Sequence, residues 1–107
     1  MLSAVANDPV LVRLRTALMG LYGARLERVL LFGSRARGEA RPQSDYDVAV
    51  FLEPLDDRWA ELDRLADLRV RFLDETGAFI DAKPYPAHTY LDATPLMHEI
   101  RREGLEL

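Results

Sequence analysis

The stretch LFGSRARGEARPQSDYDVAVFL, from Leu31 to Leu52, decides the fold because it links two apolar runs through a polar connection that carries three arginines. The first run ends at Gly33-Ser34, and the second begins with Asp45 and Asp47, two carboxylates one residue apart. Short apolar runs bounded by glycine, proline and serine predict strands. Carboxylates rarely enter the buried surface of a sheet without a partner, so their position at the start of a strand needs an explanation.

Helix and strand signals on both sides of this stretch predict the remaining elements. Capping residues followed by proline begin helices, and glycines end them. In chain order we expect a helix from Asp8-Pro9 to Gly23, a strand Arg28–Phe32, a short helix from Ser34 with Gly38 near its end, a strand Asp45–Leu52, a long helix from Asp56 or Asp57 to about Thr76, a strand Phe79–Tyr85 and a helix from Thr94-Pro95 to Gly104. Pro84 in the third strand and Pro86 directly after it predict that this strand lies at an edge or ends early.

This order of elements predicts an α/β (α+β) fold, a small mixed β-sheet with helices packed on it, in a single domain that spans residues 1–107. The first two strands are joined only by a short helix and a turn and need not be parallel, hence the mixed sheet. The long helix carries an apolar stripe that is expected to face the core: Trp59, Leu62, Leu65, Ala66, Phe72 and Leu73.

Composition narrows the functional class. The chain has 107 residues, no cysteine and a net charge of -4. The absence of cysteine excludes disulfides and thiolate metal sites and fits a cytosolic protein. We see no signal peptide and no apolar run near the roughly 20 residues of a membrane span. The acidic balance argues against direct nucleic-acid binding, although Arg35, Arg37 and Arg41 form a local basic cluster, as a solvated loop also would.

The Gly33-Ser34 junction has the features of an anion site. Free N–H groups at the start of a helix attract phosphate, and glycine allows close approach of the backbone. Ser34 is placed to cap the helix or contact the phosphate, with Arg35 and Arg37 adding charge; an ordinary structural turn is the alternative. The glycine spacing imitates a P-loop, but Glu39-Ala40 stands where that motif needs lysine followed by serine or threonine, which excludes a Walker-type NTPase.

The paired carboxylates suggest a metal site once a third is added. On a strand, Asp45 and Asp47 share a face, where ionised carboxylates repel unless a cation lies between them. Alone, the pair favours a solvated turn before a strand that begins at Val48. Asp81 lies in another apolar strand, and if the two strands are neighbours it reaches the same cations. Three carboxylates beside a phosphate-binding turn describe a two-metal phosphoryl-transfer site.

Other polar residues carry less information. Lys83 shares a strand face with Asp81 and is either a phosphate contact or an exposed edge lysine. His88 and His98 lack metal-ligand spacing, and we expect them in a loop and on a helix surface. The apolar residues of the last third are either core or a partner surface: Tyr85, Tyr90, Leu91, Leu96 and Met97.

The central motif resembles a known family. Gly33-Ser34, ten residues, then Asp45-Tyr46-Asp47 is similar to the motif of the minimal nucleotidyltransferases (MNT), a branch of the DNA polymerase β-like superfamily. Asp81 matches the family's third carboxylate, and the tail from Pro95 to Gly104 is also similar. The resemblance implies a mixed sheet with its helices on one side, and transfer of a nucleoside monophosphate from an NTP. It implies that Gly33 and Ser34 hold the triphosphate, and that Asp45, Asp47 and Asp81 bind two Mg²⁺ ions, with Asp81 helping the acceptor hydroxyl to ionise.

A free-standing minimal unit of this kind most resembles the antitoxin of a HEPN/MNT toxin–antitoxin pair. The implied function is transfer of AMP from ATP to a tyrosine of a HEPN ribonuclease toxin, within a hetero-oligomer. Two alternatives stay open: an antitoxin that neutralises its partner by binding alone, and a nucleotidyltransferase acting on RNA or a small molecule.

Overall fold

A four-stranded mixed sheet forms the centre of the molecule. The computed structural model describes residues 7–107 and contains strands β1 (Leu26–Phe32), β2 (Tyr46–Leu52), β3 (Ile80–Pro86) and β4 (Leu105–Glu106). Their order across the sheet is β3-β2-β1-β4. β1 pairs with β2 and β4 in antiparallel fashion, whereas β2 and β3 are parallel. The predicted mixed sheet is therefore confirmed, with the proline-containing β3 at an edge.

The three long helices begin and end where the caps predict. They are α2 (Pro9–Tyr22), α3 (Arg58–Thr76) and α4 (Pro95–Glu103), and short 3-10 segments η1 (Gly23–Arg25) and η2 (Ala87–Leu91) follow α2 and β3. The side chains of Asp8, Asp57 and Thr94 each accept a backbone N–H of the first turn. Such caps satisfy N–H groups that the helix itself leaves without partners, which fixes the starting point.

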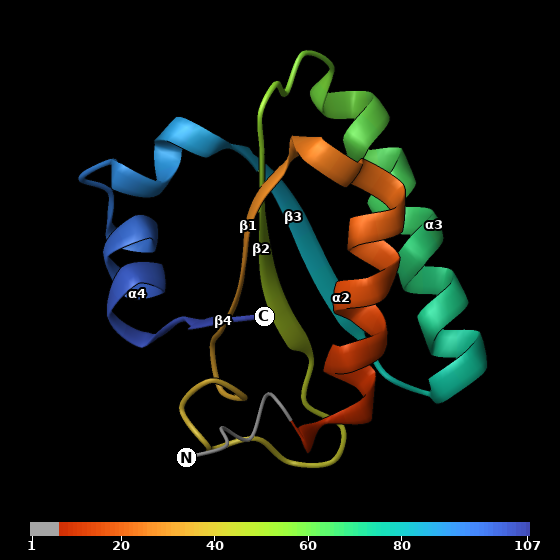
Figure 1. Ribbon diagram of the computed structural model, residues 1–107. Helices are drawn as coiled ribbons and strands as arrows, with labels where there is room; N and C mark the ends of the chain where they lie inside the picture. The colour runs from red at the N-terminus through yellow and green to blue at the C-terminus, as the bar shows by residue number, and fades with distance from the viewer. Residues whose placement is uncertain (1–6) are drawn as a thin grey trace.

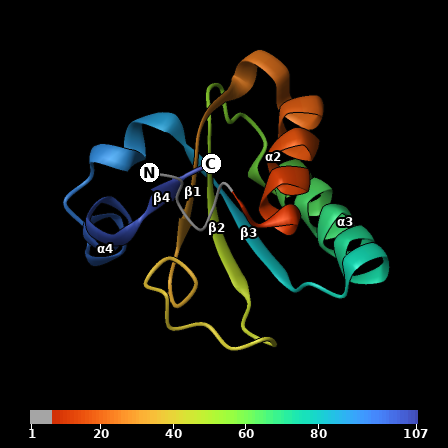
Figure 2. The same ribbon diagram turned by 60° about the horizontal axis from the view of Figure 1, so that its bottom comes forward.

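Helices cover both faces of the sheet (Figures 1 and 2). α2 and α3 lie on one face, where Leu14, Leu18 and Phe72 join Val48 and Val50 in the larger core. α4 lies on the opposite face, where its Met97 and Ile100 pack on three residues of the sheet, namely Leu30, Ala49 and Phe51. The expectation that all helices share one side is therefore wrong. β2 is buried on both faces, which explains why its sequence is a continuous apolar run.

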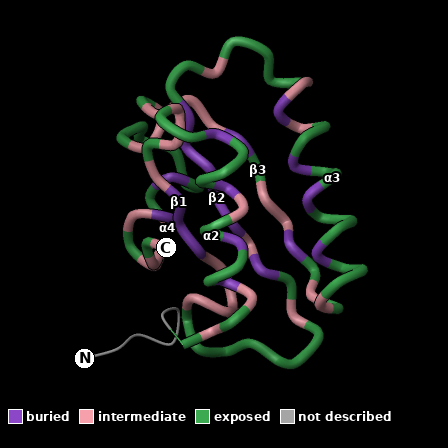
Figure 3. Tube along the Cα trace, turned by 45° about the vertical axis from the view of Figure 1, so that its right-hand side comes forward, coloured by how far each residue is buried: buried purple, intermediate pink, exposed green. Residues whose placement is uncertain are grey.

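Three further differences have physical causes. Ser34 to Gly38 forms turns instead of the predicted short helix, because only two backbone hydrogen bonds, Arg37 N–H to Gly33 O and Glu39 N–H to Ser34 O, close the segment. β4 was not predicted, because two residues are too few to show alternation. In α3, Glu61 is buried whereas Trp59 is exposed. The side of the helix that faces the core is therefore rotated from the predicted apolar stripe; Figure 3 shows the buried positions along α3.

The C-terminal third divides between core and surface. Met97 is buried, and Tyr85 and Tyr90 pack against Phe51. Leu91 and Leu96 are exposed. From residue 7 onward, the fold contains no helix that is both long and apolar enough to cross a membrane.

Candidate functional site

The site residues meet at one end of the sheet, where β1 ends and β2 and β3 begin. Phe32, the last residue of β1, is the register partner of Asp47. Asp47 is in turn the register partner of Asp81 in the parallel β2–β3 pair. Register partners on parallel strands point to the same face at strand spacing, roughly 5 Å apart. The topology therefore brings together two carboxylates that are 34 positions apart in the sequence.

Gly33 makes room for Asp47. It has a φ of +75°, which other L-residues adopt only with strain. A Cβ atom added to Gly33 would also collide with Oδ2 of Asp47, so the backbone of the turn approaches this carboxylate directly. Gly38 has the same φ, but a Cβ there would meet nothing within 4 Å. Gly33 is thus required by conformation and by contact, whereas Gly38 is required by conformation alone.

Arg35 holds the turn against β2. Its guanidinium lies 3.9 Å from the centroid of the Tyr46 ring, and its Nε donates to the Ser44 carbonyl at 2.9 Å. The Tyr46 hydroxyl donates to Oδ2 of Asp8 at 2.7 Å. Burial, and then this hydrogen bond, raise the pKa of Tyr46 to about 12. Tyr46 therefore fastens the start of α2 and the arginine turn to the strand that carries Asp47.

Arg37 joins the turn to α4. Its guanidinium donates to Glu39 at 2.5 Å and to Glu103 at 3.2 Å. It also lies 4.0 Å from Glu99. These carboxylates balance the positive charge of Arg37. The prediction that Arg35 and Arg37 contact a triphosphate stays a prediction, and any such contact would have to compete with these protein partners.

Asp47 lies in an unfavourable electrostatic environment. Desolvation by burial is the main cause that raises the pKa of Asp47, and the charges of Asp81 and Asp45 raise it further. Lys83 opposes this rise, and Glu99 of α4 adds to it slightly. Lys83 is exposed, with Nζ 3.9 Å from Oδ2 of Asp81. A cation site holds like charges close together, without full compensation, before the cation binds, and Asp47 and Asp81 meet this description.

The fit to magnesium rests on two carboxylates rather than three. Within residues 7–107, no group of three or more His, Cys, Asp or Glu side chains stands close enough to hold a metal ion. Asp45 is exposed, one residue before β2. Magnesium is commonly held by one or two carboxylates together with substrate phosphates. Asp47 and Asp81, facing the Gly33 turn, fit this arrangement, and Asp45 lies close enough to influence the charge state of Asp47.

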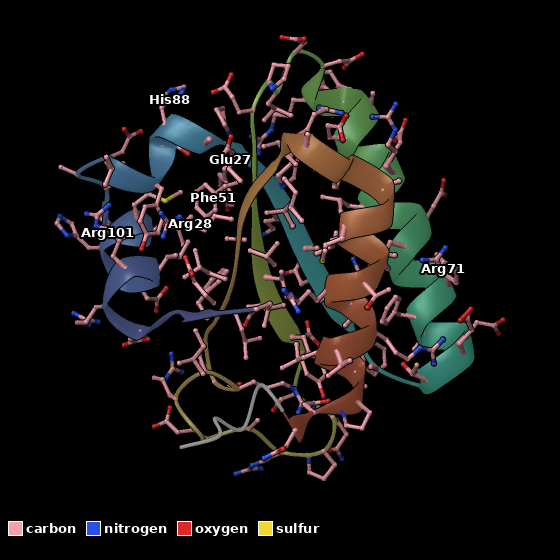
Figure 4. The ribbon with its side chains drawn as sticks, in the orientation of Figure 1. Glu27, Arg28, Phe51, Arg71, His88 and Arg101 are labelled. Atoms are coloured by element: carbon pink, nitrogen blue, oxygen red, sulfur yellow. The ribbon has the colours of Figure 1, made fainter. Side chains whose placement is uncertain are left out.

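Both histidines are exposed. His88 lies on the 3-10 segment η2 rather than in the predicted loop, and His98 lies on the surface of α4, as predicted. Figure 4 shows His88 at the end of the molecule opposite the Gly33 turn, on the same side of the sheet as Arg28 and Phe51.

Comparison with known proteins agrees with this geometry. The family model described as "Polymerase beta, Nucleotidyltransferase" matches residues 22–105. The chain belongs to this family. A search of curated proteins found no match.

Solved structures with the same fold include toxin–antitoxin complexes. One, a toxin–antitoxin with AMP-PNP, has a TM-score of 0.59 and 21% identity over 86% of this chain and 68% of that chain. A mutant MntA–HpeT toxin–antitoxin with two Asp-to-Glu substitutions has a TM-score of 0.62 and 18% identity, covering 88% of this chain and 69% of that chain. A Tyr-to-Ala mutant of that complex has a TM-score of 0.61 and 21% identity, covering 90% and 70%.

Sequence reasoning missed one charged residue near the site of this nucleotidyltransferase. Glu99 is partly buried on α4 and contributes to the pKa of Asp47. Its place in an amphipathic helix is visible in the sequence, but its approach to Asp47 depends on α4 lying on the second face of the sheet. A prediction that puts every helix on one face cannot bring them together.

Proposed function

We propose that this nucleotidyltransferase transfers AMP from ATP to a hydroxyl group of a partner protein. The observation that carries the proposal is the register pairing of Asp47 with Asp81 beside the Gly33 turn. The pair supplies negative charge that needs a cation, and the turn supplies backbone close to that charge. Phosphoryl transfer is catalysed mainly by positioning and by electrostatic stabilisation, which these two features offer.

Each residue of the site has a proposed role. Gly33 and Ser34 hold the triphosphate against the turn, while Asp47 and Asp81 would ligate Mg²⁺, with Asp45 as a further ligand from the exposed position just before β2. Two bound Mg²⁺ ions would neutralise charge on the attacking and leaving oxygens. Arg35 orients the turn through Tyr46 and Ser44, which places Gly33 beside Asp47. Arg37 is a further phosphate contact if its pairs with Glu39 and Glu103 open.

The chemical step is an in-line displacement. The acceptor oxygen forms a bond to the α-phosphorus, the bond from that phosphorus to the bridging oxygen breaks, and pyrophosphate leaves with the electron pair. Asp81 accepts the proton of the acceptor hydroxyl. Asp81 is suited to this role because it lies on the edge strand β3, half-exposed, where an acceptor has access.

We further propose that the acceptor is a tyrosine of a HEPN-type toxin and that the chain is its antitoxin, acting in the cytoplasm where ATP is plentiful. Two points support this proposal. The motif resembles that of MNT antitoxins, and the fold is shared with chains of toxin–antitoxin complexes, one of them with AMP-PNP. In residues 7–107 the domain consists of one sheet and its covering helices, so the acceptor would be recognised by the surface of this single unit.

Label transfer tests the proposal. The protein is incubated with Mg²⁺, α-labelled ATP and the HEPN-type protein encoded beside its gene, and label on that protein is measured by gel and mass spectrometry. We expect AMP on a tyrosine, lost in Asp47→Ala and Asp81→Asn. Asp74→Asn, which changes an exposed carboxylate in the last turn of α3, is the matched control and should keep full transfer.

Other outcomes would select the alternatives. A stable complex without label, equally stable with Asp47→Ala, indicates an antitoxin that acts by binding alone. Label found only on an added RNA or metabolite indicates a different acceptor, and would contradict transfer to protein.

A further inference from the structure

A groove lies between α3 and the outer edge of β3, and Asp81 of the proposed active site is among the residues that line it. Leu62, Leu65 and Ala66 of α3 form its apolar wall, residues 80–83 form its other wall, and Arg69 lies at its rim. Its volume of about 200 Å³ is below the usual range of pockets for small molecules, roughly 300–1,000 Å³, but is suited to one or two side chains of a peptide. We call it the α3–β3 groove.

The predicted apolar stripe of α3 extends beyond what the core uses. The core of this helix is formed by Leu65, Leu68 and Phe72. Trp59 stands one turn before Leu62 and two turns before Ala66, on the groove side of the helix, and is 78% exposed. A tryptophan this exposed adds nothing to the core, whereas tryptophan is enriched among the residues that dominate binding energy at protein interfaces.

The free edge of β3 has hydrogen-bonding groups over a short length. The Tyr46 N–H donates to the Phe79 carbonyl at 2.8 Å, so the odd-numbered residues of β3 direct their backbone groups toward β2. The even-numbered residues then face outward, where Pro84 and Pro86 have no N–H to donate. Ala82 and Ile80 are left with N–H and carbonyl groups at the edge. An added strand can therefore pair with residues 80–83 and no further.

The charge around the groove selects the occupant. Arg69 and Lys83 lie on its two walls, and Lys83 is paired with Asp81, which also lines the groove. Within the part of the chain that the structure describes, Arg69 has no ion-pair partner. The apolar wall and the unpaired Arg69 would attract an extended segment that carries apolar side chains and a carboxylate.

The geometry points to the α3–β3 groove as the docking site for an extended segment of the partner protein, which adds a strand to the edge of β3 and brings its acceptor hydroxyl to Asp81. Main-chain hydrogen bonds to Ala82 give affinity, and Trp59 and the apolar wall recognise alternate side chains. The inference rests on the proposed function for the identity of the acceptor. It adds where the partner binds and in what conformation.

Hydrogen exchange and variants test the docking site, with the HEPN-type protein encoded beside the gene as the probe. We expect slower exchange at the Ala82 amide in the complex. Ala82→Pro removes a backbone N–H that faces outward, on the same side of the strand as Pro84 and Pro86. It should weaken binding of the partner protein at least tenfold and leave AMP-PNP binding unchanged. Circular dichroism and thermal unfolding check that this variant folds.

Two side-chain pairs provide matched controls. Trp59→Ala should weaken the complex at least tenfold, whereas Leu91→Ala, which removes a side chain that is also 78% exposed but lies on the opposite face, should change affinity less than twofold. Arg69→Glu should weaken binding, and Arg15→Glu, an exposed arginine of α2, should not.

The outcomes separate the docking site from the reaction. Label transfer with no protection of β3 and no effect of these variants overturns the docking site and leaves the proposed function intact. Protection and weakened binding without label support the docking site and contradict AMP transfer. Absence of both a complex and label transfer overturns both. If the isolated chain dimerises and Ala82→Pro or Trp59→Ala abolishes the dimer, the groove holds a second copy and the inference is wrong.

Discussion

Two carboxylates, Asp47 and Glu61, lie in the same domain in opposite electrostatic environments. Glu61 is only 2% exposed, yet its Oε1 accepts from Arg25 at 3.3 Å and also from Arg64. Asp47 is less buried, but burial and then its carboxylate neighbours Asp81 and Asp45 raise its pKa, while Lys83 compensates only in part. The more deeply buried carboxylate is thus the better paired one.

The difference shows which carboxylate supports the fold and which is suited to binding a cation. A buried charge that only supports the fold must have its own counter-ions, because an unpaired one costs several kcal/mol. Glu61 meets this condition and links α3 to Arg25 beyond α2. Asp47 has the opposite arrangement, which costs stability unless a cation arrives. The molecule concentrates uncompensated negative charge at one place on its sheet, beside the turn proposed to hold phosphates.

The largest expected effect separates the two carboxylates by activity. Asp47→Asn should lower AMP transfer by roughly 10³-fold, because it removes a proposed metal ligand that acts on the charge of the transition state. Glu61→Gln should keep transfer within about threefold when assayed below its unfolding temperature. Steady-state label transfer at saturating ATP measures both. A Glu61→Gln loss equal to that of Asp47→Asn would mean that the two sites are not separate.

The second prediction uses the two glycines that share a φ of +75°. Gly33→Ala must adopt the strained φ and also displace the Asp47 carboxylate, so transfer should fall about 10²-fold, the order expected when catalytic groups are misplaced. Gly38→Ala carries only the backbone strain, about 1 kcal/mol, and should keep its activity. Comparing kcat of both variants, with thermal unfolding as a check on folding, isolates the contact. Equal losses would contradict the role of Gly33 beside Asp47.

The third prediction concerns stability on the Glu61 side. Arg25→Met keeps the apolar stem but removes hydrogen bonds to Glu61 and to the Pro54 carbonyl. Arg64 remains, and Arg25 is itself partly exposed, so we expect a loss of about 1–2 kcal/mol rather than the full cost of an unpaired buried charge. Chemical denaturation measures this loss. AMP transfer should be unchanged, and a variant as stable as the wild type would show that Arg64 alone compensates Glu61.

Local signals in the sequence are sufficient for the three long helices and for three of the four strands, because caps and prolines act within one turn. Strand alternation predicts that Asp47 and Asp81 lie together only on the condition that their strands are neighbours, and the sequence alone does not establish that condition. The burial of Glu61 was not predictable in this way. Its arginine Arg25 lies 36 positions away and approaches only after α2 and α3 pack on the same face.

The main feature that the sequence does not predict is the covering of both faces of the sheet by helices. A strand buried on both sides has the same apolar run whether its second cover is a helix or a partner protein, so β2 alone does not place α4. Helical spacing places Trp59 in the predicted core stripe, because spacing alone cannot distinguish the stripe that faces the core from one rotated slightly around the helix. The exposed Trp59 and the turn at Ser34 are both tertiary outcomes, and both border the proposed site or its groove.

The smallest expected effect tests the charge of Asp47 through stability. Folding raises the pKa of Asp47 above its unfolded value, so the folded state favours the protonated form. The contribution of protonated Asp47 to the stability of the folded state is fully present below the unfolded pKa, about 3.9. It is lost as the pH rises through the higher pKa of the folded state. At pH 7 Asp47→Asn should therefore be more stable than the wild type by about 0.5 kcal/mol, or ~2–4 °C in Tm, and the difference should vanish near pH 3.

Magnesium should reverse the ranking, because a cation between Asp47 and Asp81 removes the repulsion in the wild type alone. Calorimetric scans of both proteins from pH 3 to 7.5, with and without Mg²⁺ and AMP-PNP, measure this change, and Asp74→Asn controls for the loss of any exposed carboxylate. An Asp47→Asn variant that is less stable at pH 7 in the absence of metal would mean that Asp47 is compensated within the protein. It would then resemble Glu61, and the distinction between the two carboxylates would fail.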